Sequence, residues 1–293
     1  MEELAYRTFL LGFAFTVAAS ALYVALPLWP RVLYRAAATQ AGSVVIAAPG
    51  SVPGWLPPAA TAASVGALAS LTASLGLRWA AAGHPPFANM WEYTVAFTWG
   101  IVLFYVLFER LYRQRTLGAV TLPVAATLQA VSLAFFPSEV QPLIPALQSE
   151  RILFLHVGTM MVAYAALTVS FGGAVLYFVQ GGGRRFARLP DASLAEEIAH
   201  RAVLVGFPLL ALGIALGAWW GNSAWGRYWG WDPKETSALV TWLIYALYLH
   251  MRGLRGWRGG RAAVVLIAGY AAVLFSYFAV NLVVSGLHSY AGV

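Results

Sequence analysis

Residues 262–284 read AAVVLIAGYAAVLFSYFAVNLVV, a run of 23 residues without Asp, Glu, Lys or Arg. About 20 apolar residues in a helix are enough to cross the hydrocarbon core of a bilayer. The run has no alternation of apolar and polar positions, and backbone groups in lipid must be satisfied within their own segment. It therefore predicts a membrane-spanning helix and not a strand of a barrel.

The same pattern recurs through the chain, which is 60% hydrophobic and only 10% charged, with a mean hydropathy of +0.71. Such a composition is typical of a polytopic membrane protein. We predict an all-α membrane helical bundle of about eight transmembrane helices in one integral-membrane domain, residues 1–293. The predicted spans lie at about residues 8–29, 59–82, 88–108, 116–136, 152–179, 202–220, 236–251 and 262–284.

The basic residues predict how the chain sits in the membrane. When alternate connections are assigned to opposite faces, thirteen of the 18 Lys and Arg fall on one face. They are Arg31, Arg35, Arg110, Arg113, Arg115, Arg184, Arg185, Arg188, Arg201, Arg252, Arg255, Arg258 and Arg261. By the positive-inside rule this face is cytoplasmic, so both termini are expected outside the plasma membrane. Topology accounts for the net charge of +7, and no nucleic-acid partner is expected.

Smaller features of the chain carry further expectations. The first apolar segment follows Glu2 and Glu3 and not a basic stretch, so it is expected to be retained as a helix. Arg35 to Pro58, rich in Ala, Gly and Pro, is expected to be the longest inner loop and the most flexible. Residues 191–201 suggest a short helix on the inner membrane surface, or a plain connector helix. The chain has no cysteine, so any thiols in its chemistry come from another protein.

An external tryptophan-rich segment, residues 219–235, lies between two long apolar runs. It reads WWGNSAWGRYWGWDPKE and holds five of the twelve tryptophans. Indole faces stack on large rings and indole N–H groups donate hydrogen bonds at a membrane boundary. This density exceeds what one helix end needs for anchoring and predicts a flat apolar ligand with polar edges, such as haem. The candidate ligand-binding residues are Trp219, Trp220, Trp225, Arg227, Tyr228, Trp229, Trp231, Asp232, Lys234 and Glu235.

Two histidines are expected on the same outer face. His156 lies about a turn inside the outer end of one span, and His288 follows the last span. Two imidazoles could approach haem iron from opposite sides, while the tryptophans cover its ring and Arg227 or Lys234 meets a propionate. The alternative for each histidine is an interfacial polar residue bonded to backbone.

Three other histidines have weaker expectations. His250 falls near the inner leaflet, where a titratable group is a functional candidate, or else a snorkelling residue beside Arg252. His84 and His200 are expected to be solvated.

Further polar and sulfur-bearing residues lie close to the predicted site. Asn89 and Glu92 are three apart and either support the site or cap a helix. Met160 and Met161 offer sulfur near His156, but packing is the expected reason for them.

The segment ending WGWDPKE resembles the tryptophan-rich WWD signature of proteins that handle haem in cytochrome c maturation. The surrounding sequence is similar to the CcsA/ResC branch of the system II pathway. The matching stretches are Gly83–Glu92, Leu155–Met161, Gly206–Leu210, Thr241–Tyr245 with His250, and Asn281–Leu282 with Gly286–Tyr290. The similarity starts at about residue 83, so residues 1–82 are two less typical spans and residues 83–293 form the WWD core. The chain has Trp91 where the family tends to have Tyr.

The resemblance implies a function. It implies that the chain works with a CcsB/ResB-type membrane subunit, conducts haem b across the membrane and holds it at an external site. There the haem vinyl groups react with the thiols of a Cys-x-x-Cys-His motif on apocytochrome c. His156 and His288 are then the external axial ligands of the haem iron. His250 is the inner ligand, with a second histidine from the partner. No residue is assigned as catalytic, and whether this chain alone is an enzyme stays open within the expected cytochrome c synthase complex.

Two other functions remain open at this point. A CcmC-type protein uses a similar loop to load haem onto a carrier protein, but eight spans and the Gly-Leu-His-Ser-Tyr tail favour system II. A small-molecule permease could use the tryptophan-rich segment as a substrate gate and would need no axial histidines.

Overall fold

A computed structural model describes residues 1–29, 32–39, 42–49, 51–141, 150–284, 286 and 288. Arg31 and the tail residues Ser285, Leu287, Ser289 and Tyr290 lie outside these described residues. In order, the elements are α1 Glu2–Leu28, β1 Val32–Thr39, β2 Gly42–Pro49, α2 Leu56–Ala82, α3 Met90–Tyr112, the 3-10 turn η1 Arg115–Leu117, α4 Gly118–Phe135, α5 Glu150–Val179, α6 Ala192–Trp225, α7 Pro233–Arg255, α8 Gly260–Leu274, the π-helical segment η3 Phe275–Ala279 and α9 Val280–Leu282.

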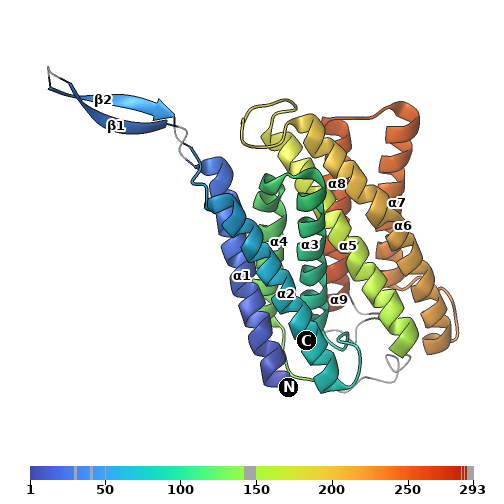
Figure 1. Cartoon of the computed structure of the whole chain (residues 1–293). Helices are drawn as coiled ribbons and strands as arrows, with labels where there is room; N and C mark the ends of the chain where they lie inside the picture. The colour runs from blue at the N-terminus through green and yellow to red at the C-terminus, as the bar shows by residue number, and fades with distance from the viewer. Residues whose placement is uncertain are drawn as a thin grey trace.

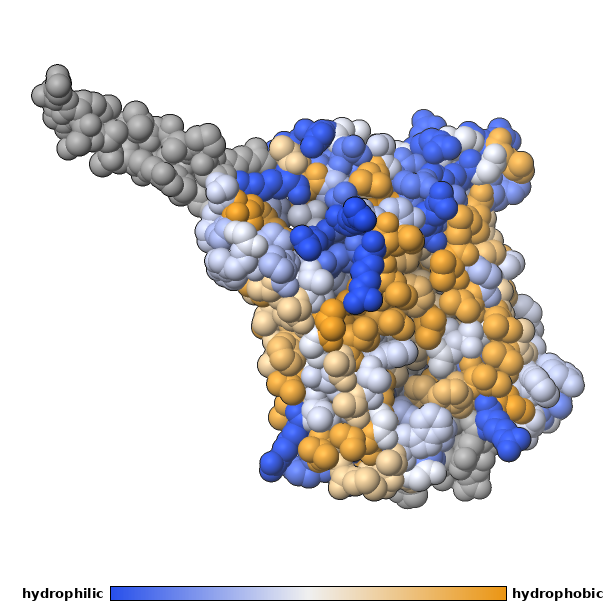
Figure 2. Space-filling view, viewed as in Figure 1, coloured by the Kyte–Doolittle hydropathy of each residue, from blue (hydrophilic) through white to orange (hydrophobic). Residues whose placement is uncertain are grey.

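The long helices stand side by side and alternate in direction, so the chain crosses the bundle eight times (Figure 1). Seven helices among the described residues are long and apolar enough to cross a membrane. The eighth, α7, is as long but more polar, since it carries residues such as Thr241, Tyr245 and His250. A band of hydrophobic residues covers the middle of the visible face, and hydrophilic residues gather at the end where α6 begins (Figure 2). The predicted polytopic helical bundle is confirmed.

The segment between α1 and α2 differs from its prediction. Instead of only a flexible loop, it contains an antiparallel hairpin in which Val32 pairs with Pro49 and Thr39 with Gly42. The second strand includes Val44, Val45 and Ile46, and β-branched residues favour extended backbone. The content of Ala, Gly and Pro hid this local preference. The hairpin projects from the end of the bundle where α1 ends and α2 begins (Figure 1).

Helices α5 and α6 pack closely through small residues. A Cβ atom at Gly173 would lie 2.6 Å from the Ala195 carbonyl oxygen, and one at Gly206 would lie 2.9 Å from Leu167. Small side chains at a helix contact let the backbones approach, as is usual in membranes. Residues 192–201 are part of this contact, so the expected separate surface helix is wrong: they form the first turns of α6. Asp191 caps this helix by accepting a hydrogen bond from the Leu194 backbone N–H at 2.8 Å.

A buried ion pair joins α2 to α3 at the end of the bundle opposite the hairpin. Arg78 Nε donates to Glu92 Oε1 at 2.7 Å, and the side chains are 2% and 0% exposed. The same guanidinium donates to the carbonyls of Ser138 and Glu139, each at 2.7 Å. Glu92 also accepts from the Ala88 backbone N–H at 2.6 Å. This network fixes the turn that leads into α3.

We expect Glu92→Gln to lower the free energy of unfolding by about 3 kcal/mol, because it removes the buried carboxylate and leaves Arg78 only the half-exposed Glu2, 3.4 Å from its Nη1, as an ionic partner. Chemical unfolding in mixed micelles would measure the loss. Arg7→Gln is the control, since Arg7 pairs with Glu3 at 2.7 Å while both side chains are about 70% exposed. An exposed pair contributes little, so the control should keep its unfolding midpoint. Equal effects of the two substitutions would contradict this reading of the network.

Candidate functional site

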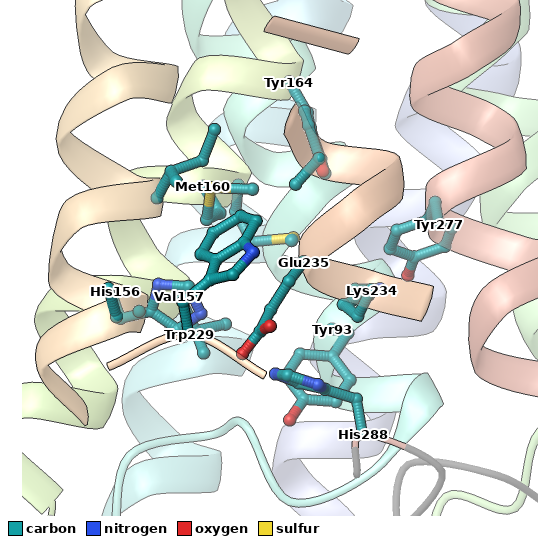
Figure 3. A pocket seen from close by; sticks show the side chains of 15 residues that line it. Tyr93, His156, Val157, Met160, Tyr164, Trp229, Lys234, Glu235, Tyr277 and His288 are labelled. Carbon is teal, nitrogen blue, oxygen red and sulfur yellow. The ribbon is translucent and has the colours of Figure 1, made fainter. Parts of the chain in front are cut away.

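A cavity lies at the end of the bundle where α6 ends and α7 begins. It has about 850 Å³ of empty volume, its open mouth included. Helices α3, α5, α6 and α7 and the segment η3 all contribute to its wall (Figure 3). Its lining residues are Tyr93, His156, Val157, Met160, Met161, Tyr164, Ile214, Gly217, Ala218, Trp229, Lys234, Glu235, Ala238, Tyr277 and His288. The two histidines predicted to share a face therefore line one cavity.

His156 is held by α6 although it belongs to α5. Its Nδ1 lies 2.8 Å from the Gly213 carbonyl oxygen, which can only accept, so Nδ1 carries the proton. A Cβ atom at Gly217 would lie 2.5 Å from His156 Cε1, so the ring rests directly on the backbone of α6. The Trp220 ring lies nearly parallel to the imidazole, at 13° and 6.1 Å between centroids. With Nδ1 protonated, the lone pair of the ring is at Nε2.

His288 reaches the cavity from the chain beyond α9. Its Nδ1 lies 2.7 Å from Asp232 Oδ2, and the two side chains are 14% and 3% exposed. Its ring packs against two tryptophans of α6, with centroids 5.8 Å from Trp220 and 4.9 Å from Trp225. Trp220 therefore contacts both imidazoles. In Figure 3 the two histidines reach the cavity from different sides.

The tryptophan-rich segment is divided between a helix end and a loop. Helix α6 continues to Trp225, so Trp219, Trp220 and Trp225 are helical. Among the described tryptophans of this segment, only Trp229 lines the cavity, so the covering of a ligand by the other four stays a prediction. Trp219, Tyr228 and Trp231 are exposed, Trp231 by 71%. Trp220 and Trp225 position the histidines instead.

A capping box closes the loop and begins α7. Asp232 accepts from the Lys234 backbone N–H at 3.0 Å, and Glu235 Oε2 accepts from the backbone N–H groups of Gly230 and Asp232 at 2.8 and 3.1 Å. Such reciprocal caps satisfy donors that the first turn of a helix leaves open. Trp231 has a positive φ of 57°, which these bonds hold in place. The loop is therefore rigidly joined to α7.

Of the two expected cations, only Lys234 lines the cavity, where its Nζ donates to the Ser276 carbonyl at 3.0 Å. Arg227 is exposed. Its guanidinium packs against Gly230, where an added Cβ atom would lie 2.6 Å from Arg227 Nε. Of the two alternatives, Arg227 or Lys234, the lining of the cavity favours Lys234. The difference comes from helix α7, whose first turn places residue 234 under the loop.

The remaining candidates lie away from the cavity. Asn89 caps α3 by accepting from the Glu92 backbone N–H at 2.9 Å, so the capping alternative is confirmed for Asn89, and Glu92 belongs to the ion pair described above. His84, expected to be solvated, is buried, with Nδ1 2.9 Å from the Pro85 carbonyl. His200 is half-buried, 3.3 Å from the Tyr248 hydroxyl. His250 is exposed on α7.

Some cavity residues were missed by sequence reasoning. Tyr93, Tyr164 and Tyr277 line it, and Tyr277 OH lies 2.7 Å from Thr94 Oγ1. Tyr277 belongs to η3, and a sequence does not show where a helix widens to a π turn. The spacing of Gly213, Gly217 and Gly221 could have indicated the surface on which His156 rests, since residues four apart share a helix face. Met160 and Met161 line the wall as apolar packing beside His156.

The sequence of this chain is similar to those of known proteins. The sequence profile of the family described as "Cytochrome C assembly protein" matches residues 87–288, which include both cavity histidines. "Cytochrome c biogenesis protein CcsA" of Synechococcus elongatus is 36% identical, and the match covers 80% of this chain and 88% of that protein. The protein with the same description from Mesostigma viride is also 36% identical, with 74% and 80% covered.

One solved structure shares the fold. "Cytochrome c Heme Lyase CcmF" superposes with a TM-score of 0.69 at 20% sequence identity. The match covers 94% of this chain but only 46% of CcmF, so this chain spans less than half the length of that protein. The match extends to α1 and α2, which lie before the family profile begins at residue 87.

Proposed function

Because this chain belongs to the cytochrome c assembly protein family, we propose that it is the haem-handling subunit of a system II cytochrome c synthase. In this proposal it carries haem b across the membrane, holds it between His156 and His288, and presents it to the Cys-x-x-Cys-His motif of apocytochrome c. One observation carries the proposal: two imidazoles from separate segments line one cavity, and each has its Nδ1 bonded to an acceptor.

The residues of the cavity fit haem. Val157, Met160 and Met161 give it an apolar wall, and Lys234 provides a cation for a carboxylate. Metal-binding histidines commonly donate their other ring N–H to a carboxylate or a carbonyl, as both histidines do here. The buried Tyr164 hydroxyl also lines the cavity and adds a polar group to its apolar wall.

The chain's own residues hold and orient the substrate. When bound, haem supplies an iron that takes two axial ligands and two vinyl groups that form thioether bonds with thiols. His156 and His288 bind the iron through Nε2, and Lys234 binds a propionate. Trp220 keeps both imidazoles in place, and Trp229 covers the cavity. Fixed orientation matters because each vinyl group must meet the correct thiol of the apocytochrome. This chain has no cysteine that could compete for a vinyl group.

The charges of the two ends support an orientation in the plasma membrane. Arg113, Arg115, Arg184, Arg185 and Arg188 lie in the connections at the end of the bundle opposite the cavity. By the positive-inside rule that end faces the cytoplasm. The cavity, the tryptophan-rich loop and both termini then lie on the outer side, where apocytochrome c is met.

His250 fits the role of inner haem ligand. It lies 17 residues after Pro233, about 25 Å along α7 from the cavity end. It is exposed on the outside of the bundle, where a CcsB/ResB-type subunit could bring a second histidine to the same haem. Arg252, two residues on, is buried and pairs with Glu196, so the end of α7 is firmly joined to α6.

Co-expression of the chain with a CcsB/ResB-type subunit and an apocytochrome c tests the proposal. We expect thioether-linked haem, seen as haem that stays with the cytochrome on denaturing gels and by its pyridine hemochrome spectrum. An apocytochrome whose two cysteines are replaced by alanine is the control and should gain no covalent haem. A requirement for a separate haem carrier would indicate CcmC-type delivery. A purified chain without haem would contradict the proposal and favour the permease.

A further inference from the structure

Asp232 makes two bonds that join the start of α7 to the end of the chain. Its carboxylate caps α7 through the Lys234 backbone N–H at 3.0 Å and accepts from His288 Nδ1 at 2.7 Å. The Asp232 side chain is only 3% exposed. The chain passes close over it, since a Cβ atom at Gly286 would lie 2.5 Å from Asp232 Oδ1. The position of His288 is therefore set by the capping residue of another segment.

The two cavity histidines have unlike partners. His288 donates to a carboxylate, whereas His156 donates to the neutral carbonyl of Gly213 at 2.8 Å. A hydrogen bond to an ionised acceptor is roughly twice as strong as one between neutral groups. It draws the Nδ1 proton toward the acceptor and raises electron density at Nε2, which strengthens the imidazole as a metal ligand. The same ring type thus has two different donor strengths in one cavity.

We infer that Asp232 is a positioning residue that makes the two axial ligands unequal, with His288 the stronger and His156 the one more easily displaced. The part about haem rests on the proposed function. The part about the imidazole is that Asp232 keeps the proton of His288 on Nδ1. This part concerns the haem-free protein and does not rest on the proposed function.

Two axial histidines of unequal strength suit a site that must release its haem. Transfer of haem to apocytochrome c requires that one axial bond to the iron break. The histidine of the Cys-x-x-Cys-His motif then binds the iron at that position. The bond between iron and His156 Nε2 breaks, and the neutral incoming imidazole forms the new one. The leaving imidazole of His156 and the incoming imidazole are both neutral, so this exchange of ligands needs no proton and no electron. His288 stays bound to the iron throughout and keeps the haem in its orientation.

Asp232→Asn tests the inference, because asparagine still caps a helix but has no charge. Asp191→Asn is the matched control: it makes the same substitution at the residue that caps α6, where Asp191 accepts from the Leu194 backbone N–H and does not line the cavity. In haem-free protein labelled with ¹⁵N-histidine, we expect the nitrogen shifts of His288 to show the proton on Nδ1 in wild type and Asp191→Asn. In Asp232→Asn this preference should be lost. A His288 protonated on Nε2 in the wild type would overturn the inference.

With haem bound, the same variants report on ligand strength. We expect Asp232→Asn to release haem to an acceptor such as apomyoglobin about 10- to 100-fold faster, the usual effect of removing such a partner. The g values of its ferric low-spin signal should also shift, since they follow the donor strength of the axial imidazoles. Asp191→Asn should change neither the release rate nor the g values. Equal effects of both variants would mean that the change comes from weaker helix capping and not from the lost bond between Asp232 and His288. Absence of haem from the wild type would refute the proposed function and leave the nitrogen shifts of the haem-free protein as the test of Asp232.

Discussion

Replacing either His156 or His288 by alanine should remove the haem held at the cavity end of the bundle and leave the protein folded in the membrane. Haem bound by one imidazole in an open cavity exchanges its second ligand for water, and much of its affinity is lost. We expect the Soret band of the external haem to disappear from each purified variant. A Soret band of unchanged position and intensity in both variants would refute the assignment of the ligands.

The fold should survive because neither ring is part of the main core contacts. His156 gives up one hydrogen bond to Gly213, and His288 gives up its bond to Asp232. A single such bond contributes about 1 kcal/mol for a neutral pair and somewhat more for a charged one. His200→Ala is the matched control. His200 lies near Tyr248, away from the lining of the cavity, so this variant should keep the full external haem band.

Gly217→Ala should weaken haem binding although residue 217 is not itself a ligand of the iron. The added Cβ would lie 2.5 Å from His156 Cε1 and 2.9 Å from its Nδ1. The imidazole must therefore move off α6, which disturbs its bond to Gly213 and its contact with Trp220. A ligand set works only when held within about 0.5 Å of its productive geometry. We expect at least a tenfold loss of haem affinity, about 1.4 kcal/mol, measured by haem titration of the haem-free protein.

Gly158→Ala provides the comparison for this change. Gly158 is also helical and lies two residues from His156, but a Cβ atom there would meet nothing within 4 Å. The control adds the same methyl group beside the site without moving the ring. Its affinity for haem should equal that of the wild type. If Gly158→Ala weakens binding as much as Gly217→Ala, the loss reflects a general effect of a methyl group added to a helix beside the site and not displacement of His156.

The sequence predicted the helices better than their ends. The span at residues 202–220 was correct in type, but α6 begins at Ala192 and continues to Trp225. Both extensions depend on packing: Ala195 faces Gly173 of α5, and Trp220 and Trp225 enclose the ring of His288. Hydropathy does not record such contacts. The hairpin Val32–Thr39 and Gly42–Pro49 was missed because its Ala and Gly content is also typical of a loop.

The site was predicted in part. His156 and His288 were expected on one face from the parity of the spans, and they do line one cavity. The density of tryptophan indicated the right segment but not the work of each ring, since Trp219 and Trp231 are exposed and Trp220 is buried. Arg227 and Lys234 were equally good candidates for a propionate partner in the sequence. Because α7 begins at Pro233, Lys234 lies in its first turn and lines the cavity, whereas Arg227 stays in the loop.

The amino-acid sequence alone determined that this chain is a membrane bundle and which end of each helix its histidines occupy. Both follow from the length of the apolar runs and from counting spans, which are local properties of the chain. Only the tertiary structure decided that His288 donates to Asp232 while His156 rests on Gly217. Those contacts join residues 56 or more positions apart, and they depend on how closely α5 and α6 approach and on where α7 begins.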